Sequence, residues 1–177
     1  MLIHSKSRKE TDKLADYLAK KILSAGSRKN AVVLSLIGNL GAGKTHFVKA
    51  FMKGLGIKDK IQSPTFNIMR IYRVTVDQRQ LKADGKQNTK SKKSRLPRST
   101  SGTRDGKSGF RNAYHIDAYR IKSHDLLKLG FKGIVKDPGN IVLIEWADIV
   151  KDILPKGAIN IEIEYTAKEG ERKIRLT

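Results

Sequence analysis

Apolar residues recur along this chain with two spacings, one typical of helices and one of buried strands. The four-residue spacing of Leu14, Leu18 and Ile22, behind the capping pattern of residues 7–10, predicts a helix over residues 8–25 that stops at Gly26. Residues 44–55 have a similar amphipathic spacing and end at Gly56, which predicts a second helix. Residues 123–130 form a short third amphipathic segment.

Runs of Val, Ile and Leu predict the strands. Residues 31–37 and 141–144 are apolar without alternation, which is typical of parallel strands that are covered on both faces. Alternation in residues 159–165, followed by a turn at Glu169-Gly170 and residues 173–176, predicts an antiparallel hairpin. A second hairpin is expected from strands at residues 66–72 and 113–119. The pattern therefore predicts an α/β fold in a single domain of 177 residues, with a partly parallel central sheet, flanking helices and antiparallel hairpin additions.

The net charge of +20 is concentrated in one stretch. Residues 73–112 contain twelve Lys and Arg against three Asp, a local charge of +9. Polar residues without periodicity dominate there, so we interpret residues 76–110 as a flexible basic insertion at the tip of the second hairpin. Such a loop is either a contact for phosphate-rich partners such as RNA or simply a solvated segment, and the sequence leaves both open.

Composition also excludes several kinds of site. The chain has no Cys, so disulfides and thiolate metal sites are excluded. No apolar run approaches the length of a membrane span, and the start has no signal-peptide core, so we expect a soluble, cytoplasmic protein without membrane contact.

A glycine-rich motif joins the first apolar strand to the second helix. Residues 38–45 read Gly-Asn-Leu-Gly-Ala-Gly-Lys-Thr, which has the spacing of a P-loop, so we expect a P-loop NTPase-like sheet. Glycines let successive backbone amides converge on a phosphate beside the positive end of a helix. Lys44 is expected to reach the β- and γ-phosphates of ATP, and the Thr45 hydroxyl to bind Mg²⁺. The expected nucleotide-binding residues of this loop are Asn39, Leu40, Gly41, Ala42, Gly43, Lys44, Thr45 and His46.

Polar residues at other strand ends supply candidates for the remaining chemistry. Glu145 ends a buried strand and is the best second metal anchor, although a carboxylate that merely caps the strand fits the same pattern. Asp117 is a candidate to hold water in the crevice. His115, two residues earlier on the same face, is either part of that site or a structural histidine. Thr65, in Ser63-Pro64-Thr65, occupies the position of a switch loop that senses the γ-phosphate.

Four motifs in order make the resemblance to a family specific. The P-loop, Ser63-Pro64-Thr65-Phe66, the segment Tyr114–Arg120 and Leu143-Ile144-Glu145-Trp146 resemble the bacterial TsaE (YjeE) family, from Thr11 to the end except for the basic insertion. The members of that family are small P-loop ATPases required for threonylcarbamoyl modification of the adenosine next to the tRNA anticodon. The chain differs from the usual pattern at Asn39, where Asp is common, and at His46, where Thr is common.

The resemblance implies roles for individual residues and partners. Lys44 and Thr45 are implied to bind ATP and Mg²⁺, Glu145 to bind Mg²⁺, Thr65 to belong to the switch and Asp117 to support hydrolysis. Ser7, Thr11 and Arg172 are implied to lie near the nucleotide base. The implied partners are the TsaD and TsaB proteins, with tRNA reached through their complex, and ATP hydrolysis is implied to reset the TsaD–TsaB assembly. Two other functions stay open: a P-loop small-molecule kinase, and an RNA-binding module with a regulatory nucleotide site.

Overall fold

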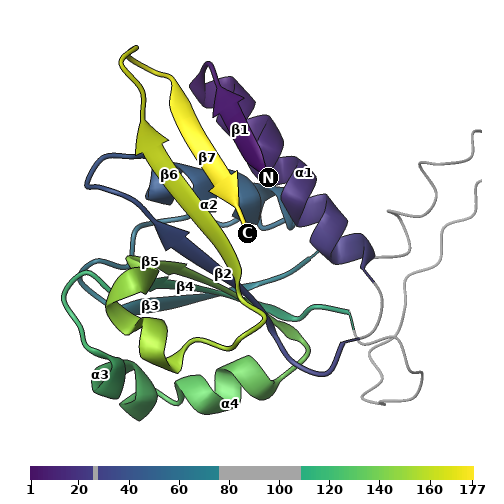
Figure 1. The fold of residues 1–177 in the computed structure, drawn as a ribbon. Coiled ribbons are helices and arrows are strands. Elements are labelled where there is room, and N and C mark those ends of the chain that lie inside the picture. Colours follow the sequence, from purple (N-terminus) through teal and green to yellow (C-terminus); the bar gives the residue numbers. More distant parts are fainter. Residues whose placement is uncertain (26–27, 76–108) are drawn as a thin grey trace, which may run out of the picture.

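A computed structural model describes residues 1–25, 28–75 and 109–177 of the chain. The expected basic insertion at 76–110 lies outside these residues except for its last two positions. Within the described residues one sheet contains seven strands, shown in Figure 1. The strands are β1 (Leu2–Ser5), β2 (Val32–Ile37), β3 (Met69–Arg73), β4 (Asn112–Asp117), β5 (Asn140–Glu145), β6 (Ile159–Tyr165) and β7 (Arg172–Leu176). The helices are α1 (Arg8–Ser24), α2 (Lys44–Gly54), α3 (Ser123–Lys128), α4 (Phe131–Lys136) and the 3₁₀ helix η2 (Ala147–Ile153).

The sheet has a parallel centre and antiparallel edges. Its strand order is β1-β7-β6-β2-β5-β4-β3, and β6, β2, β5 and β4 run parallel to one another. Antiparallel pairing adds β3 at one edge and β7 and β1 at the other. This arrangement confirms the predicted α/β fold with antiparallel hairpin additions. Register places Glu145 beside Leu36 on one side and Asp117 on the other, so three strands deliver their carboxyl ends to one place.

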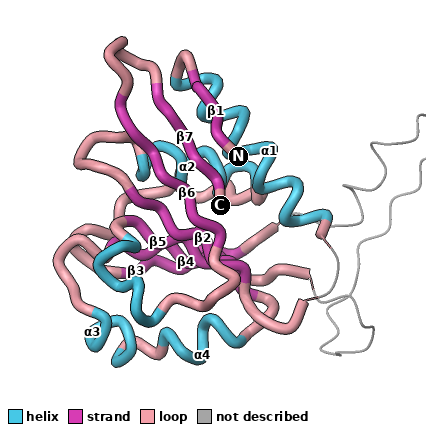
Figure 2. Tube along the Cα trace, viewed as in Figure 1, coloured by secondary structure: helices cyan, strands magenta, loops and turns pink. Residues whose placement is uncertain are grey.

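Helices cover both faces of the sheet, as Figures 1 and 2 show. Helices α1 and α2 pack on one face, where Phe47 and Phe51 of α2 are fully buried against Leu34 and Leu36 of β2. On the other face, α3, α4 and η2 cover Val33, Val142 and Ile144. Burial on both faces explains why β2 and β5 are continuously apolar, as the sequence indicated.

Local signals define α1 well. The Ser7 hydroxyl accepts a hydrogen bond from the Glu10 amide at 3.3 Å and so caps the helix. The second hydrogen bond of this capping pattern runs from the Lys6 amide to the Glu10 carboxylate at 2.6 Å, so its donor is the residue before Ser7 rather than Ser7 itself. The helix ends at Ser24, one residue before the predicted end.

Several elements differ from the expectation. The strand predicted from Phe66 begins only at Met69, because Ile68 has a φ of 61° and the preceding residues turn, leaving Phe66 89% exposed. The strand predicted to reach Tyr119 ends at Asp117. The pattern did not predict β1, α4 or η2, which are short elements of four, six and seven residues.

The second hairpin returns to the core before β4 begins. Phe110 is 6% exposed and belongs to the core on the α1–α2 face. The Arg28 guanidinium lies 4.0 Å from the centre of its ring. Phe110 was predicted to be the last residue of the flexible insertion, and that prediction is wrong at this position, because the ring belongs to the core.

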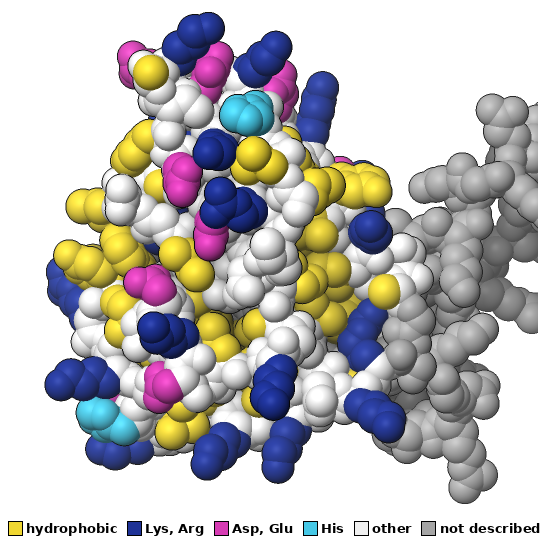
Figure 3. Space-filling model, viewed as in Figure 1, with side chains coloured by type: hydrophobic (Ala, Val, Ile, Leu, Met, Phe, Trp, Pro, Cys, Tyr) yellow, Lys and Arg dark blue, Asp and Glu magenta, His cyan; other side chains and the backbone are white. Residues whose placement is uncertain are grey.

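Basic side chains are exposed outside the predicted insertion as well. On the face seen in Figure 3, Lys and Arg gather over α3 and α4, where Lys128, Lys132 and Lys136 lie, whereas the β6–β7 end mixes basic and acidic side chains. No helix in the described part of the chain is long and apolar enough to cross a membrane.

Candidate nucleotide-binding site

The loop between β2 and α2 has the backbone conformation that its glycines predict. Gly38, Gly41 and Gly43 have φ values of 149°, 76° and 108°, which side-chain-bearing residues rarely adopt. A Cβ at Gly38 would overlap the carbonyl oxygen of Ile163 on β6, so this glycine also permits close packing of loop and sheet. Gly43 precedes α2 without a side-chain cap. The amides of the first turn of α2 are therefore free to bind an anion.

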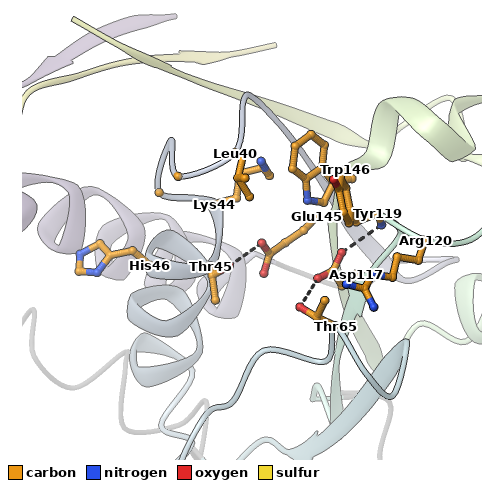
Figure 4. Close-up of a pocket in the computed structure, with 12 residues that line it drawn as sticks. Leu40, Lys44, Thr45, His46, Thr65, Asp117, Tyr119, Arg120, Glu145 and Trp146 are labelled. Atoms are coloured by element: carbon orange, nitrogen blue, oxygen red, sulfur yellow. Dashed lines mark hydrogen bonds between the residues drawn. The ribbon is translucent and has the colours of Figure 1, made fainter.

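A cleft of about 370 Å³ opens beside this loop, and Figure 4 shows its lining. Residues from four segments meet there. They are Leu40, Gly41, Gly43, Lys44, Thr45, His46, Thr65, Asp117, Tyr119, Arg120, Glu145 and Trp146. The cleft thus brings together Lys44, Thr65, Asp117 and Glu145, the four residues predicted to take part in ATP hydrolysis. Thr45 also meets Glu145 there, although the two are 100 positions apart in the sequence.

Thr45 and Glu145, the two predicted metal ligands, lie in contact in the cleft. The Thr45 hydroxyl, in the first turn of α2, donates a 2.7 Å hydrogen bond to Oε2 of Glu145 at the end of β5. Within the described residues, no cluster of three His, Cys, Asp or Glu could hold a metal ion. Mg²⁺ is commonly held by one or two protein ligands, with water and substrate phosphates as the remaining ligands. Thr45 and Glu145 could be the two protein ligands of such a site.

Lys44 is a buried cation inside the loop. Its side-chain nitrogen donates to the carbonyl oxygens of Gly38 and Asn39 at 2.6 and 3.0 Å. The same nitrogen lies 3.5 Å from the centre of the Trp146 ring. Burial lowers the pKa of Lys44, and the charges of Glu145, Asp117 and Asp148 oppose that shift.

Trp146, the residue after Glu145, also lines the cleft. Its left-handed backbone, with φ of 58°, places the ring over Lys44 where β5 ends. The neighbouring ring of Tyr119 lies 4.9 Å from it, centre to centre. No local pattern in the sequence signals this packing.

Asp117 connects the predicted switch loop to the strand end. Its Oδ2 accepts a hydrogen bond from the Thr65 hydroxyl at 2.7 Å, and its Oδ1 accepts from the Tyr119 amide at 3.0 Å. Thr65 also shares a 2.7 Å hydrogen bond with the Ser63 hydroxyl. A group that displaced Thr65 from Asp117 would therefore move the loop that carries Phe66.

His115 lies behind the cleft rather than in its lining, and its ring contacts Glu145. It is fully buried on β4, and its Nε2 lies 2.7 Å from Oε1 of Glu145. Glu145 therefore has hydrogen-bond partners on both carboxylate oxygens.

A second cavity of about 240 Å³ adjoins the loop on its other side. Thr11, His46 and Arg172 line it, together with Arg8, which the sequence analysis did not single out. The Arg172 Nε donates to the carbonyl oxygen of Ala42 at 2.7 Å, and the Thr11 hydroxyl lies 2.8 Å from that of Ser5. Ser7 lines neither cavity, because its hydroxyl caps α1.

Comparison with known proteins identifies the family. The family model described as "Threonylcarbamoyl adenosine biosynthesis protein TsaE" matches residues 5–84 and 102–174. The chain belongs to the TsaE family. The unmatched residues 85–101 lie inside the basic insertion. The resemblance found in the four motifs is thereby confirmed.

Relatives and a solved structure agree with membership of the TsaE family. The tRNA threonylcarbamoyladenosine biosynthesis protein TsaE of Bacillus subtilis is 32% identical over 155 residues, covering 88% of this chain and 75% of that protein. The protein of the same name from Rickettsia conorii is 32% identical over 160 residues, covering 89% of this chain and 67% of its own. The crystal structure of YdiB from Bacillus subtilis superposes with a TM-score of 0.59 at 26% identity, covering 99% of this chain and 83% of that one.

Proposed function

We propose that this chain is a slow, Mg²⁺-dependent ATPase that acts in the biosynthesis of tRNA threonylcarbamoyladenosine. Membership of the TsaE family supports the pathway. The contact between Thr45 and Glu145 beside a glycine-rich phosphate loop is the main support for this chemistry, because a hydroxyl and a carboxylate so close together could both bind the Mg²⁺ of a nucleotide.

The residues present fit ATP and Mg²⁺. The loop amides and Lys44 are donors suited to phosphate oxygens, and Thr45 and Glu145 are oxygen ligands suited to Mg²⁺. Bound Mg²⁺ would supply charge neutralisation on the β- and γ-phosphates. Thr11 and Arg172 line the adjoining cavity, where they would contact the base, and His46 lies between the two cavities.

Asp117 and Thr65 would act on the side of the γ-phosphate. Asp117 opens into the cleft and would orient the attacking water through its carboxylate. Thr65 is already bonded to that carboxylate, so the switch loop would respond to the state of the nucleotide.

Catalysis by the isolated chain is expected to be weak. Two arginines near the strand ends, Arg70 and Arg120, are candidates to stabilise the transition state. Arg120 lines the cleft and Arg70 does not, and among the described residues neither has a side-chain hydrogen bond that would fix its guanidinium. Transition-state charge in P-loop ATPases is commonly stabilised by such an arginine, in cis or from a partner. We infer that TsaD and TsaB complete the site, that tRNA is reached through them, and that hydrolysis resets the TsaD–TsaB assembly.

The test is ATP hydrolysis with and without TsaD, TsaB and tRNA. Lys44→Ala should abolish turnover, and Glu145→Ala should weaken Mg²⁺-dependent ATP binding. Lys49→Ala, an exposed change on the same helix, and Glu164→Ala, an exposed change on β6, are matched controls that should behave as wild type. Unchanged activity in both Lys44→Ala and Glu145→Ala, or turnover of many ATP per second without partners, would contradict the proposal.

A further inference from the structure

Both oxygens of the Glu145 carboxylate have a hydrogen-bond partner. Glu145 is 2% exposed, with Thr45 on Oε2 and His115 on Oε1, each at 2.7 Å. A glutamate side chain has three rotatable bonds, so one hydrogen bond alone would leave the plane of its carboxylate free to turn. The partner on Oε1 therefore decides where Oε2 points.

The contact with Glu145 favours a proton on Nε2 of His115. An ionised carboxylate, the form that binds Mg²⁺, only accepts hydrogen bonds, so Nε2 would then be the donor to Glu145. Nδ1 is buried and has no partner among the described residues. An unprotonated Nδ1 leaves only a spare acceptor there, whereas the other tautomer would bury an unpaired N–H and set two acceptors against each other at 2.7 Å.

The strand next to His115 is consistent with this tautomer. Arg70 on β3 is directly paired with His115 on β4, so both side chains lie on the same face of the sheet. The Nε of Arg70 is buried and has no hydrogen-bond partner among the described residues, and it can only donate. An unprotonated Nδ1 therefore places an acceptor, rather than a second unpaired donor, on the face that Arg70 shares.

The imidazole has both apolar and polar neighbours on this face. Ala113 on β4 and Leu143 on β5 are apolar and fully buried, whereas Arg70 is its cross-strand partner and Glu145 contacts its Nε2. An apolar side chain could fill this place, but it would leave Oε1 of Glu145 without this partner, so the bond to Glu145 is what the imidazole adds to packing.

We propose that His115 is a positioning residue for Glu145: its Nε2–H orients the carboxylate so that Oε2 faces Thr45 and is ready to bind Mg²⁺. This inference rests on the proposed function for the identity of the metal, but the bond to Glu145 does not. Partners that orient a metal ligand typically change metal affinity by about 10- to 100-fold when removed.

The first test needs no nucleotide. Nitrogen-15 NMR of the imidazole rings, assigned with a His115→Gln variant, reports which ring nitrogen is protonated in the folded chain. We expect the proton on Nε2. A proton on Nδ1 alone would overturn the proposal, because Nε2 could not then donate to Glu145.

The second test measures Mg²⁺ dependence of ATP binding, with ATP binding in EDTA as the reference for an intact loop. His115→Leu should raise the half-saturating Mg²⁺ concentration by about 10-fold or more, with ATP binding in EDTA unchanged. His115→Gln, whose amide nitrogen can reach the place of Nε2, should restore most of the affinity. An unchanged Mg²⁺ midpoint in His115→Leu, or an equal loss in His115→Gln, would overturn the proposal.

A double variant separates positioning from general damage. If His115 acts only through Glu145, adding His115→Leu to Glu145→Ala should not shift the Mg²⁺ midpoint further, whereas an additive shift would refute the mechanism. Should His115→Leu fail to fold, His115→Asn replaces it, because its shorter amide cannot reach Oε1 and should lose the affinity that His115→Gln keeps. If the wild-type chain shows no Mg²⁺-dependent ATP binding, the proposed function fails, while the NMR measurement still decides the bond between His115 and Glu145.

Discussion

Replacing Gly38 by alanine tests whether the phosphate loop depends on glycine at its first position. The residue has a φ of 149°, in a region that alanine avoids. A Cβ there would overlap the carbonyl oxygen of Ile163, which belongs to the backbone of β6 and cannot rotate away. Either the loop or the β2–β6 pair must therefore shift.

The expected cost follows from these two effects. Holding a non-glycine residue in such a backbone region costs about 1 to 3 kcal/mol. Forcing extra volume into packed structure costs about another 1 to 3 kcal/mol. We expect Gly38→Ala to lower the free energy of unfolding by about 2 to 6 kcal/mol, and to weaken ATP binding because the loop amides no longer converge.

The assay is equilibrium urea unfolding, with Gly133→Ala as the control. Gly133 is exposed within α4, and a Cβ added there meets nothing within 4 Å. Alanine at that site should raise the free energy of unfolding by about 0.5 to 1 kcal/mol, since it favours the helix. If the free energy of unfolding of Gly38→Ala lies within about 0.5 kcal/mol of the wild-type value, the reasoning about this loop is wrong.

Three further predictions concern other parts of the chain. Ser7→Ala should lower the free energy of unfolding by about 1 kcal/mol in urea, because it removes the α1 cap; an unchanged value would show that the cap is unimportant. Hydrogen bonds, chiefly from the Gly139 amide and then from Arg111, lower the pKa of Asp137. The contribution of Asp137 to stability is therefore present above its ordinary pKa of 3.8, and it is lost as the pH falls through the lower pKa of the folded state. Asp137→Asn should therefore be less stable than wild type at neutral pH, with a difference in urea midpoint that shrinks in acid, and a pH-independent difference would contradict this. Replacing residues 78–107 by a short Gly-Ser turn should weaken the salt dependence of tRNA binding. The slope of log binding constant against log salt concentration should become less steep by about 0.7 to 0.9 for each lost phosphate contact. An identical slope would show that the insertion does not bind tRNA.

The sequence alone was sufficient for the elements with strong local signals. These local signals are the Ser7 cap of α1, the apolar spacing of α1 and α2, the apolar runs of β2 and β5, and the glycine spacing of the phosphate loop, all of which are properties of neighbouring residues. These signals predict the α/β fold, and four short motifs, the phosphate loop among them, are enough to indicate the TsaE family. The short elements β1, α4 and η2 were missed, because four to seven residues carry too little periodicity and are held by packing.

The arrangement of the site was decided by tertiary structure. The sequence named Thr45, Asp117 and Glu145 as candidates, but only the parallel register of β2, β5 and β4 brings their side chains to one cleft. The bond between His115 and Glu145, and the placement of Trp146 over Lys44, have no local signal. Residue type determines which chemistry a side chain can perform, whereas contacts between distant positions depend on how strands pair and helices pack, and that is a property of the whole folded chain.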